Sequence, residues 1–221
     1  MHNWYVYRKF EDTAKACADF IAGKIEESIR ERGVCHIVLP GGSTPAGCLA
    51  YLAQKNLQWN KTHWYPGDER CYPAGHEDRN DVMLQKNFWC RLSGIHTYPI
   101  KAELGAEKAA ELYRETISVI ECFDIAFLGM GEDGHTASLF PESNALEDQR
   151  SVIPVHNSPK APDDRVSLSV KTLSKARCKI VLTGGKAKSE VIKRIKNNAV
   201  LPINSLGDIV WFLDEAANSD V

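Results

Sequence analysis

The chain has 221 residues, of which 43% are hydrophobic and 25% are charged, and these proportions exclude a disordered or fibrous protein. Lysine and arginine number 27 against 29 aspartate and glutamate residues, so the net charge is −2 and gives no electrostatic reason to expect nucleic acid or a membrane surface as a partner. A compact chain of this length buries roughly 70% of its unfolded surface, which is enough for one core. We therefore expect a single domain over residues 1–221.

The location and the cysteine chemistry follow from two further observations. The first residues contain no secretory h-region and no stretch approaches the ~18 apolar residues of a membrane span, which predicts a cytoplasmic protein. The cysteines are odd in number, widely spread and never arranged as CxxC, so we expect reduced thiols rather than a disulfide framework or a zinc site. They are Cys17, Cys35, Cys48, Cys71, Cys90, Cys122 and Cys178.

Hydrophobic spacing predicts strands that alternate with helices along the chain. In chain order we expect a strand at 4–7, a helix at 13–32, a strand at 34–39, a helix from near 45, a strand at 62–65, helices at 81–91 and 105–121, strands at 124–128, 152–155, 165–170 and 179–183, a helix at 186–196 and a strand at 209–212. This pattern predicts an α/β fold: a single Rossmann-like, doubly wound domain with a mostly parallel sheet and helices on both faces. Ligands bind outside the carboxyl ends of such strands, so the loops that follow strands are the places to search for function.

The first such loop is Pro-Gly-Gly-Ser-Thr-Pro at residues 40–45. Gly41 and Gly42 let the backbone approach a ligand closely, and Ser43 and Thr44 add hydroxyl groups at the start of a helix. Free backbone N–H groups and the positive end of the helix dipole favour a phosphate at this position. A glycine-rich turn in which Ser43 or Thr44 only caps the helix explains the loop equally well.

The second loop, Gly67-Asp68-Glu69-Arg70, is followed by His76 and Asn80. Carboxylates beside a guanidinium group can position a sugar hydroxyl or stabilise developing negative charge. Taken alone, the loop is better explained as a solvated turn with local ion pairs. A metal site that uses Asp68, Glu69 and His76 is weaker still, because no HExxH or comparable ligand spacing occurs.

The third loop runs from Gly129 to Pro141 and contains three glycines in a GxGxxG pattern. A nucleotide site is not supported, because Pro141 breaks any long helix and no acidic residue ends a following strand ~20 residues later. What remains is Asp133 and His135, two residues apart at the end of a strand. A histidine there can act as a general base with the carboxylate orienting its ring, or it can simply hydrogen-bond the loop. No GxSxG elbow and no phosphate-binding GxxxxGK[ST] loop supports a serine hydrolase or a nucleoside-triphosphate enzyme.

Cations late in the chain are further candidates for binding an anion. Arg165 begins an expected strand, and Lys186 and Lys188 begin an expected helix. Arginine grips a phosphate with two parallel hydrogen bonds, and lysine supplies a mobile point charge. Taken singly, each is better explained as a surface cation.

Together, the Gly41 to Pro45 loop, Asp68-Glu69-Arg70 and the run from Gly129 to Pro141 resemble the 6-phosphogluconolactonase family. The resemblance spans nearly the whole chain, since Arg165 and Lys188 stand where that family carries later phosphate contacts. The related glucosamine-6-phosphate deaminases share the glycine loop and the Asp-Gly-His core. They typically follow the histidine with Ile-Ala-Phe-Asn-Glu-Pro and usually have an aromatic residue after Asp-Glu, whereas this chain has Thr-Ala-Ser-Leu-Phe-Pro and Arg70.

The resemblance implies hydrolysis of 6-phospho-D-glucono-1,5-lactone to 6-phosphogluconate, the second step of the oxidative pentose phosphate pathway, with no metal and no organic cofactor. It makes His135 the base that activates water and Asp133 the group that orients it, while Arg70 stabilises charge near the lactone. The residues expected to bind the substrate and its phosphate are Gly41, Gly42, Ser43, Thr44, Asp68, Arg165 and Lys188. The expected partner is a small sugar-phosphate lactone, and the expected state is a monomer or small homo-oligomer.

Some residues depart from the family pattern, and two other functions compete. Arg79 stands where the family often has serine, Glu132 and Glu142 replace smaller residues, and Lys186 competes with Lys188 as the phosphate ligand. A deaminase and isomerase of hexosamine phosphates would need a carboxylate, such as that of Asp68, poised at carbon 2. A non-catalytic sugar-phosphate sensor would use the same phosphate loop, but it usually needs an appended domain, for which 221 residues leave little room.

Overall fold

The computed structural model describes residues 2–219 of the chain. Seven strands form one sheet in which each neighbouring pair is parallel. In spatial order they are β1 (Asn3–Tyr7), β10 (Val210–Asp214), β9 (Cys178–Thr183), β6 (Ile125–Leu128), β2 (Cys35–Leu39), β3 (Thr62–Pro66) and β5 (His96–Thr97). This arrangement confirms the predicted doubly wound α/β fold.

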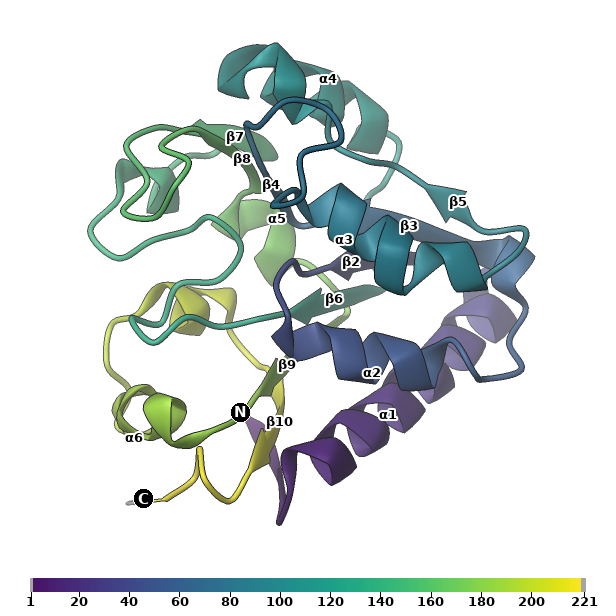
Figure 1. Cartoon of the computed structure of the whole chain (residues 1–221), viewed down its shortest axis with the longest axis vertical. Coiled ribbons are helices and arrows are strands. Elements are labelled where there is room, and N and C mark those ends of the chain that lie inside the picture. The colour runs from purple at the N-terminus through teal and green to yellow at the C-terminus, as the bar shows by residue number, and fades with distance from the viewer. Residues whose placement is uncertain (1, 220–221) are drawn as a thin grey trace.

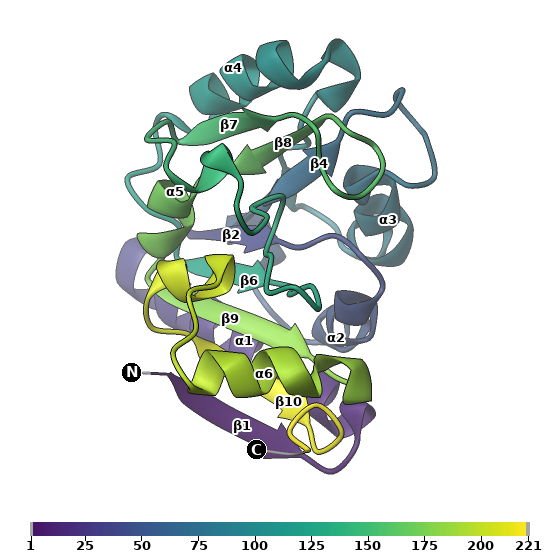
Figure 2. The same ribbon diagram turned by 90° about the vertical axis from the view of Figure 1, so that its left-hand side faces the viewer.

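Helices cover both faces of the large sheet (Figures 1 and 2). One face packs against α1 (Phe10–Arg32), α2 (Thr44–Leu52) and α3 (Asn80–Asn87). The other face carries α5 (Val170–Ser174) and α6 (Ser189–Lys196), together with a small sheet against which α4 (Ala106–Ile117) packs. Short 3₁₀ helices lie at Trp59–Lys61, Trp89–Arg91, Ala102–Leu104, Asn144–Leu146, Lys186–Lys188 and Pro202–Leu206. None of the helices within residues 2–219 combines the length and apolar character needed to cross a membrane.

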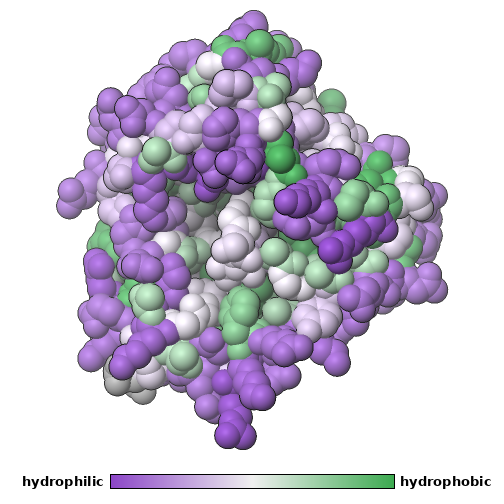
Figure 3. Space-filling model, in the orientation of Figure 1, coloured by the Kyte–Doolittle hydropathy of each residue, from purple (hydrophilic) through white to green (hydrophobic). Residues whose placement is uncertain are grey.

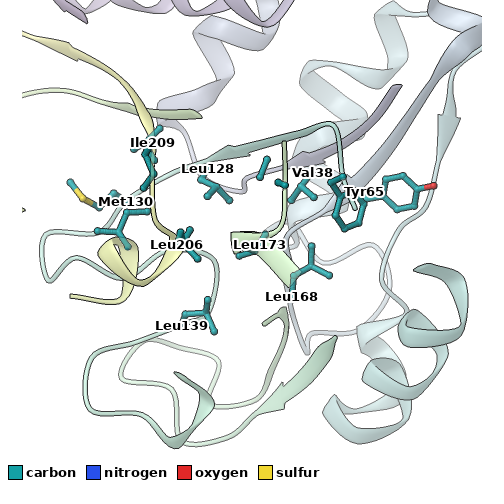
Figure 4. Close-up of a cluster of buried hydrophobic side chains, with 14 of the residues drawn as sticks. Val38, Tyr65, Leu128, Met130, Leu139, Leu168, Leu173, Leu206 and Ile209 are labelled. Carbon is teal, nitrogen blue, oxygen red and sulfur yellow. The ribbon is translucent and has the colours of Figure 1, made fainter. Parts of the chain in front are cut away.

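Two hydrophobic clusters, one on each face of the large sheet, form the core. Successive side chains of a strand point to opposite faces, so Ile37 packs with α1 while its neighbour Val38 packs on the other side. Figure 4 shows that second cluster, where Val38 and Leu128 of the large sheet lie near Leu168 and Leu173. Because both faces are covered, the strands consist mainly of buried hydrophobic residues, as their sequences predict.

The small sheet is the main feature that the sequence did not predict. It is antiparallel, in the order β4 (Asp68–Arg70), β8 (Arg165–Leu168) and β7 (Val152–Val155). The residues interpreted as a polar turn at 68–70 are therefore a short strand. The strand expected at 165–170 ends at Leu168, because the Ser169 hydroxyl accepts a hydrogen bond from the Thr172 amide at 3.2 Å and starts α5.

Several element boundaries also differ from those expected. The helix expected at 81–91 starts at Asn80 and ends at Asn87, before a separate 3₁₀ turn, and the helix expected at 105–121 ends at Ile117. The first helix starts at Phe10 rather than at residue 13. It ends where predicted, because Gly33 adopts φ 84° and its N–H bonds the Ile29 carbonyl.

The direction in which the chain adds strands to the large sheet reverses between β2 and β6, which lie next to each other. From β2 the chain continues outward to β3 and β5, and from β6 it continues to β9 and β10 on the other side. Hydrophilic residues cover most of the face seen in Figure 3. Residues of intermediate hydropathy, drawn nearly white, gather where that face is hollowed. The loops after β2 and β6 therefore meet at the point where doubly wound folds bind ligands.

Candidate active site

A cavity of about 430 Å³ opens at the carboxyl ends of β2, β3 and β6. Its volume is within the range of small-molecule sites. Nine of the ten predicted site residues line it: Gly41, Gly42, Ser43, Thr44, Asp68, Arg70, His135, Arg165 and Lys188. The tenth, Asp133, lies behind the ring of His135. The fold thus brings together three loops and two late cations that are far apart in the sequence.

The side chains of the loop after β2 do not cap the helix that follows it. Neither Ser43 nor Thr44 makes a side-chain capping bond to α2. Within the described part of the chain, no residue accepts a hydrogen bond from the backbone amides of Gly42, Ser43 or Thr44. Gly42 has φ 86°, and a Cβ on Gly41 would lie 1.9 Å from Asn80 Oδ1, so both positions require glycine. The loop therefore presents amide and hydroxyl donors to the cavity at the positive end of α2.

His135 and Asp133 form a close pair on the opposite wall. His135 Nδ1 lies 2.5 Å from Asp133 Oδ1, and the same oxygen accepts the His135 backbone N–H at 3.2 Å. Burial lowers the pKa of His135, which favours a neutral ring at neutral pH. Burial acts to raise the pKa of Asp133, but the bond to His135 and the charge of that ring bring it below its ordinary value. A neutral histidine held by a carboxylate through Nδ1 keeps its Nε2 lone pair available for a proton.

Gly131 makes room for the ring of His135. A Cβ at this position would lie 2.1 Å from the Nδ1 and Cε1 atoms of that ring. The ring also lies 4.8 Å from that of Phe140, centroid to centroid. Gly131, the second glycine of the third loop, thus serves the placement of the histidine.

Asp68 is held in a buried network. Its Oδ2 accepts the Ser138 hydroxyl at 2.6 Å, and its Oδ1 accepts the Asn80 side-chain amide at 3.1 Å. Asn80 is 2% exposed and lines the cavity, and its own Oδ1 has no hydrogen-bond partner. Sequence reasoning noted Asn80 in the second polar cluster but did not assign it to the site. The buried Oδ1 of Asn80 lies beside Gly41, where an added Cβ would come within 1.9 Å of it.

Glu69 and His76, from the same polar cluster, lie outside the cavity lining. The Glu69 carboxylate is fully buried and accepts the backbone amides of Arg70, Asn80 and Asp81 at 2.7 to 2.8 Å. Burial raises the pKa of Glu69 to about 7, while these three amides favour its charged form. His76 stacks on Tyr72 with ring centroids 4.1 Å apart. Glu69 therefore anchors the start of α3 and the strand β4.

Two arginines lie directly opposite each other on adjacent strands of the small sheet. Arg70 in β4 pairs in register with Arg165 in β8, and both line the cavity. Arg70 Nη1 donates to the Asp78 carbonyl at 2.6 Å, whereas its buried Nε has no partner. Burial lowers the pKa of Arg165. Like charges opposite each other in an antiparallel pair are unfavourable, so the arrangement favours an anion in the cavity.

The structure distinguishes the two candidate lysines. Lys188 lines the cavity, and its Nζ donates to the Met130 carbonyl at 3.0 Å. Burial lowers the pKa of Lys188. Lys186 is exposed and does not line the cavity. Lys188 is therefore the one of the two lysines that lies at the cavity, and its role as the phosphate ligand stays a prediction.

Arg79, which departs from the family pattern, is a structural residue. It is 2% exposed and forms ion pairs with Asp81 at 2.7 Å and Glu103 at 2.8 Å. It also donates to the carbonyls of Tyr72 and Ile100. The other two departures are Glu132 and Glu142. The charge of Glu132 acts to raise the pKa of Lys188, and Glu142 has φ 60° in the loop after the site. Within residues 2–219, no three His, Cys, Asp or Glu side chains gather in a way that suits a metal ion.

Known proteins of one family resemble this chain over nearly its whole length. A sequence model of the family described as glucosamine-6-phosphate isomerases/6-phosphogluconolactonase matches residues 8–211. A probable 6-phosphogluconolactonase of Schizosaccharomyces pombe is 30% identical, over 98% of this chain and 95% of that protein. A 6-phosphogluconolactonase of Synechocystis is 30% identical, over 91% of this chain and 90% of that protein. The crystal structure of a 6-phosphogluconolactonase from Thermotoga maritima superposes with a TM-score of 0.90 at 28% identity, covering 97% of this chain and all of that one. The chain belongs to the glucosamine-6-phosphate isomerase/6-phosphogluconolactonase family.

Proposed function

We propose that the protein hydrolyses 6-phospho-D-glucono-1,5-lactone to 6-phospho-D-gluconate, as in the oxidative pentose phosphate pathway. One observation carries the proposal: a partly buried, hydrogen-bonded His135–Asp133 pair lies at a cavity whose other walls hold backbone and cationic donors suited to a phosphate. The relatives named as 6-phosphogluconolactonases support the same reaction.

The general base in this proposal is His135. Its Nδ1–H is engaged by Asp133, so Nε2 takes a proton from water as the water oxygen bonds to the lactone carbonyl carbon. The resulting oxyanion needs donors, and in this proposal the guanidinium group of Arg70, which lines the cavity, supplies them. When the intermediate collapses, the bond between the carbonyl carbon and the ring oxygen breaks, and the protonated His135 returns the proton to that oxygen.

Binding of the phosphate supplies the positioning. In this proposal the amides and hydroxyls of the loop from Gly41 to Thr44, together with Arg165 and Lys188, bind the phosphate far from the reacting carbonyl. Binding energy from a remote group fixes the lactone relative to His135 and lowers the entropic cost of the reaction. Asp68 and Asn80 are placed to contact sugar hydroxyls, because both line the same cavity.

The test measures acid release from freshly generated 6-phosphogluconolactone with and without the protein. The lactone also opens spontaneously, so the uncatalysed rate is subtracted. We expect a large acceleration that is unchanged after dialysis against EDTA, because His135, water and the cationic donors suffice for the reaction. No acceleration over the uncatalysed rate would reject the proposal.

The deaminase reaction of the same family is the matched control. Asp68 lines the cavity, but both of its carboxylate oxygens already accept hydrogen bonds, from Ser138 and Asn80, which makes it a poor base at carbon 2 of a hexosamine phosphate. We therefore expect no ammonia release from glucosamine 6-phosphate under the conditions of the lactone assay. Rapid ammonia release with no lactone hydrolysis would assign the protein to the deaminase branch.

A further inference from the structure

Lys160 is a cation of the cavity that sequence reasoning did not single out. It lines the cavity from the loop between β7 and β8, residues 156–164, and it is exposed. Its ammonium group has no hydrogen-bond partner among residues 2–219, whereas Lys188 Nζ is bound to the Met130 carbonyl. Lys160 is thus a cationic side chain of the cavity whose hydrogen-bond donors are all unused.

Arg165 fixes the loop that carries Lys160. Its Nη2 donates to the carbonyls of Lys160 at 3.0 Å and Ala161 at 2.8 Å, and its Nε donates to the Pro162 carbonyl at 3.3 Å. The Ser158 hydroxyl also donates to the Lys160 carbonyl, at 2.8 Å. Arg165 is only 5% exposed, so these bonds are formed largely out of water. The loop is therefore held in place, although it lies at the rim of the cavity.

The charge of Lys160 acts on two other residues that line the cavity, His135 and Lys188. It lowers the pKa of His135 and the pKa of Lys188, although burial is the larger cause in both cases. The groups whose charges act on His135 are Asp133, Asp68 and Lys160. Two ammonium groups that repel each other at one cavity are unfavourable unless an anion lies between them.

We propose that Lys160 is a substrate-binding residue whose ammonium group contacts the phosphate of the substrate together with Lys188, and that Arg165 is its positioning residue. The proposal rests on the proposed function only for the identity of the sugar phosphate. The geometry itself requires no more than a phosphate in the cavity.

The first experiment compares Lys160→Met with the wild type for 6-phosphogluconolactone hydrolysis and for inhibition by inorganic phosphate. Loss of one charge-assisted hydrogen bond corresponds to about 10- to 100-fold in binding. We expect KM and the inhibition constant for phosphate both to rise by about that factor, while kcat stays within about threefold. Lys160→Arg is expected to restore most of the loss, because it keeps the cation. The matched control is Lys186→Met, which removes an exposed lysine outside the cavity lining and should leave KM unchanged.

Two results would overturn the proposal. If kcat falls and KM is unchanged, the ammonium group acts at the reacting carbonyl and not on the phosphate. If neither parameter changes, Lys160 is a bystander. The pH profile adds an independent readout, because removing a positive charge near His135 should raise its pKa and move the acid limb of activity to higher pH. A variant that was merely misfolded would not shift that limb in this direction.

The positioning role of Arg165 is tested by a double-mutant cycle. If Arg165 acts through Lys160, the loss in Arg165→Lys combined with Lys160→Met should be smaller than the product of the two single losses. A fully multiplicative loss would show that Arg165 does not act through Lys160. Calorimetric titration with 6-phosphogluconate separates this inference from the proposed function. Lys160-dependent binding without lactone hydrolysis would reject the proposed reaction and keep the phosphate contact, whereas Lys160-independent binding would reject the contact.

Discussion

The two ends of the strands β2 and β3 both carry clusters of polar residues. Among the described residues of these two clusters, only those at the carboxyl ends include buried side-chain atoms that lack a protein partner and belong to a cavity lining. At the amino ends, His36, His63 and His96 stack across three neighbouring strands with ring centroids 4.8 and 4.5 Å apart. The hydroxyls of Tyr65 and Tyr98 bond His36 and His63 at 3.2 and 2.9 Å. At the carboxyl ends, Arg70 Nε, Asn80 Oδ1 and the amides of the loop after β2 lack protein partners.

The contrast between the two ends indicates which of the polar clusters in this fold is functional and which is structural. Polar residues alone do not mark the site, because the histidine stack is as rich in ionisable groups as the cavity. A buried polar group without a partner is costly. Such atoms also occur away from the cavity, for example on Trp89 and Trp211, so the lack of a partner points to a ligand site only where the residue also lines the cavity. Arg79 makes the same point by contrast with Arg70, since its guanidinium bonds two carboxylates and two carbonyls of its own chain.

The largest expected effect comes from His135→Ala. Removal of a general base should lower kcat by about 10²- to 10⁴-fold while leaving the affinity for 6-phosphogluconate nearly unchanged. The matched variant at the other end of the strands, His96→Ala, should keep wild-type kcat. Steady-state kinetics and calorimetric titration measure both quantities. Equal losses in the two variants would contradict the assignment of His135 as the base and remove the distinction between the two ends.

Arg79→Ala should act on stability. The variant leaves the carboxylates of Asp81 and Glu103 without their shared cation, and breaking such a buried network costs about 3–5 kcal/mol. Arg150→Ala, which breaks an exposed pair with Asp148, should cost less than about 1 kcal/mol. Denaturant unfolding measures both free energies. A loss for Arg79→Ala as small as that for Arg150→Ala would show that the buried network is not a structural anchor.

Gly131→Ala tests whether the position of the His135 ring depends on the lack of a side chain at residue 131. The added Cβ would meet the His135 ring at 2.1 Å and displace it, and a misplacement of about 1 Å costs on the order of 10²-fold in rate. Gly129→Ala is the control, because its Cβ would lie 3.9 Å from Pro40, an ordinary contact. We expect the loss of rate in Gly129→Ala to be at least tenfold smaller than in Gly131→Ala, a difference of about 1.4 kcal/mol in the activation barrier. Similar kinetics for the two variants would mean that the ring position does not depend on Gly131.

Sequence patterns were sufficient to predict six of the seven strands of the large sheet, all but β5, and most of the charged residues that line the cavity. The hydrophobic runs at Cys35–Leu39 and Ile125–Leu128 are typical of strands buried on both faces, and the loops after them carry the glycines and His135. These signals are local, because a strand and the loop that follows it are continuous in the chain.

Signals that depend on distant pairing were not available from the sequence. Asp68-Glu69-Arg70 has only charged side chains, and it becomes a strand because β8, about a hundred residues later, pairs with it. Lys160 is a single lysine in a loop without a pattern, and its place in the cavity depends on three carbonyl bonds from Arg165. The histidine stack depends on the register of three parallel strands, which brings His36, His63 and His96 side by side.

The smallest expected effect is a pH dependence of stability caused by the histidine stack. Burial, together with the charges of the neighbouring His36 and His96, lowers the pKa of His63 to about 4, whereas the unfolded chain has the ordinary value of 6.5. Between these values the unfolded state binds the proton and the folded state does not, so stability falls as the pH drops from 6.5 to 4. Because the stack is partly solvated, the loss due to His63 should be on the order of 1 kcal/mol. In His63→Phe, which keeps an aromatic ring in the stack, thermal unfolding should show a smaller decrease in Tm between pH 7.5 and pH 4.5. An unchanged decrease would show that His63 is protonated in the folded state as readily as in the unfolded one.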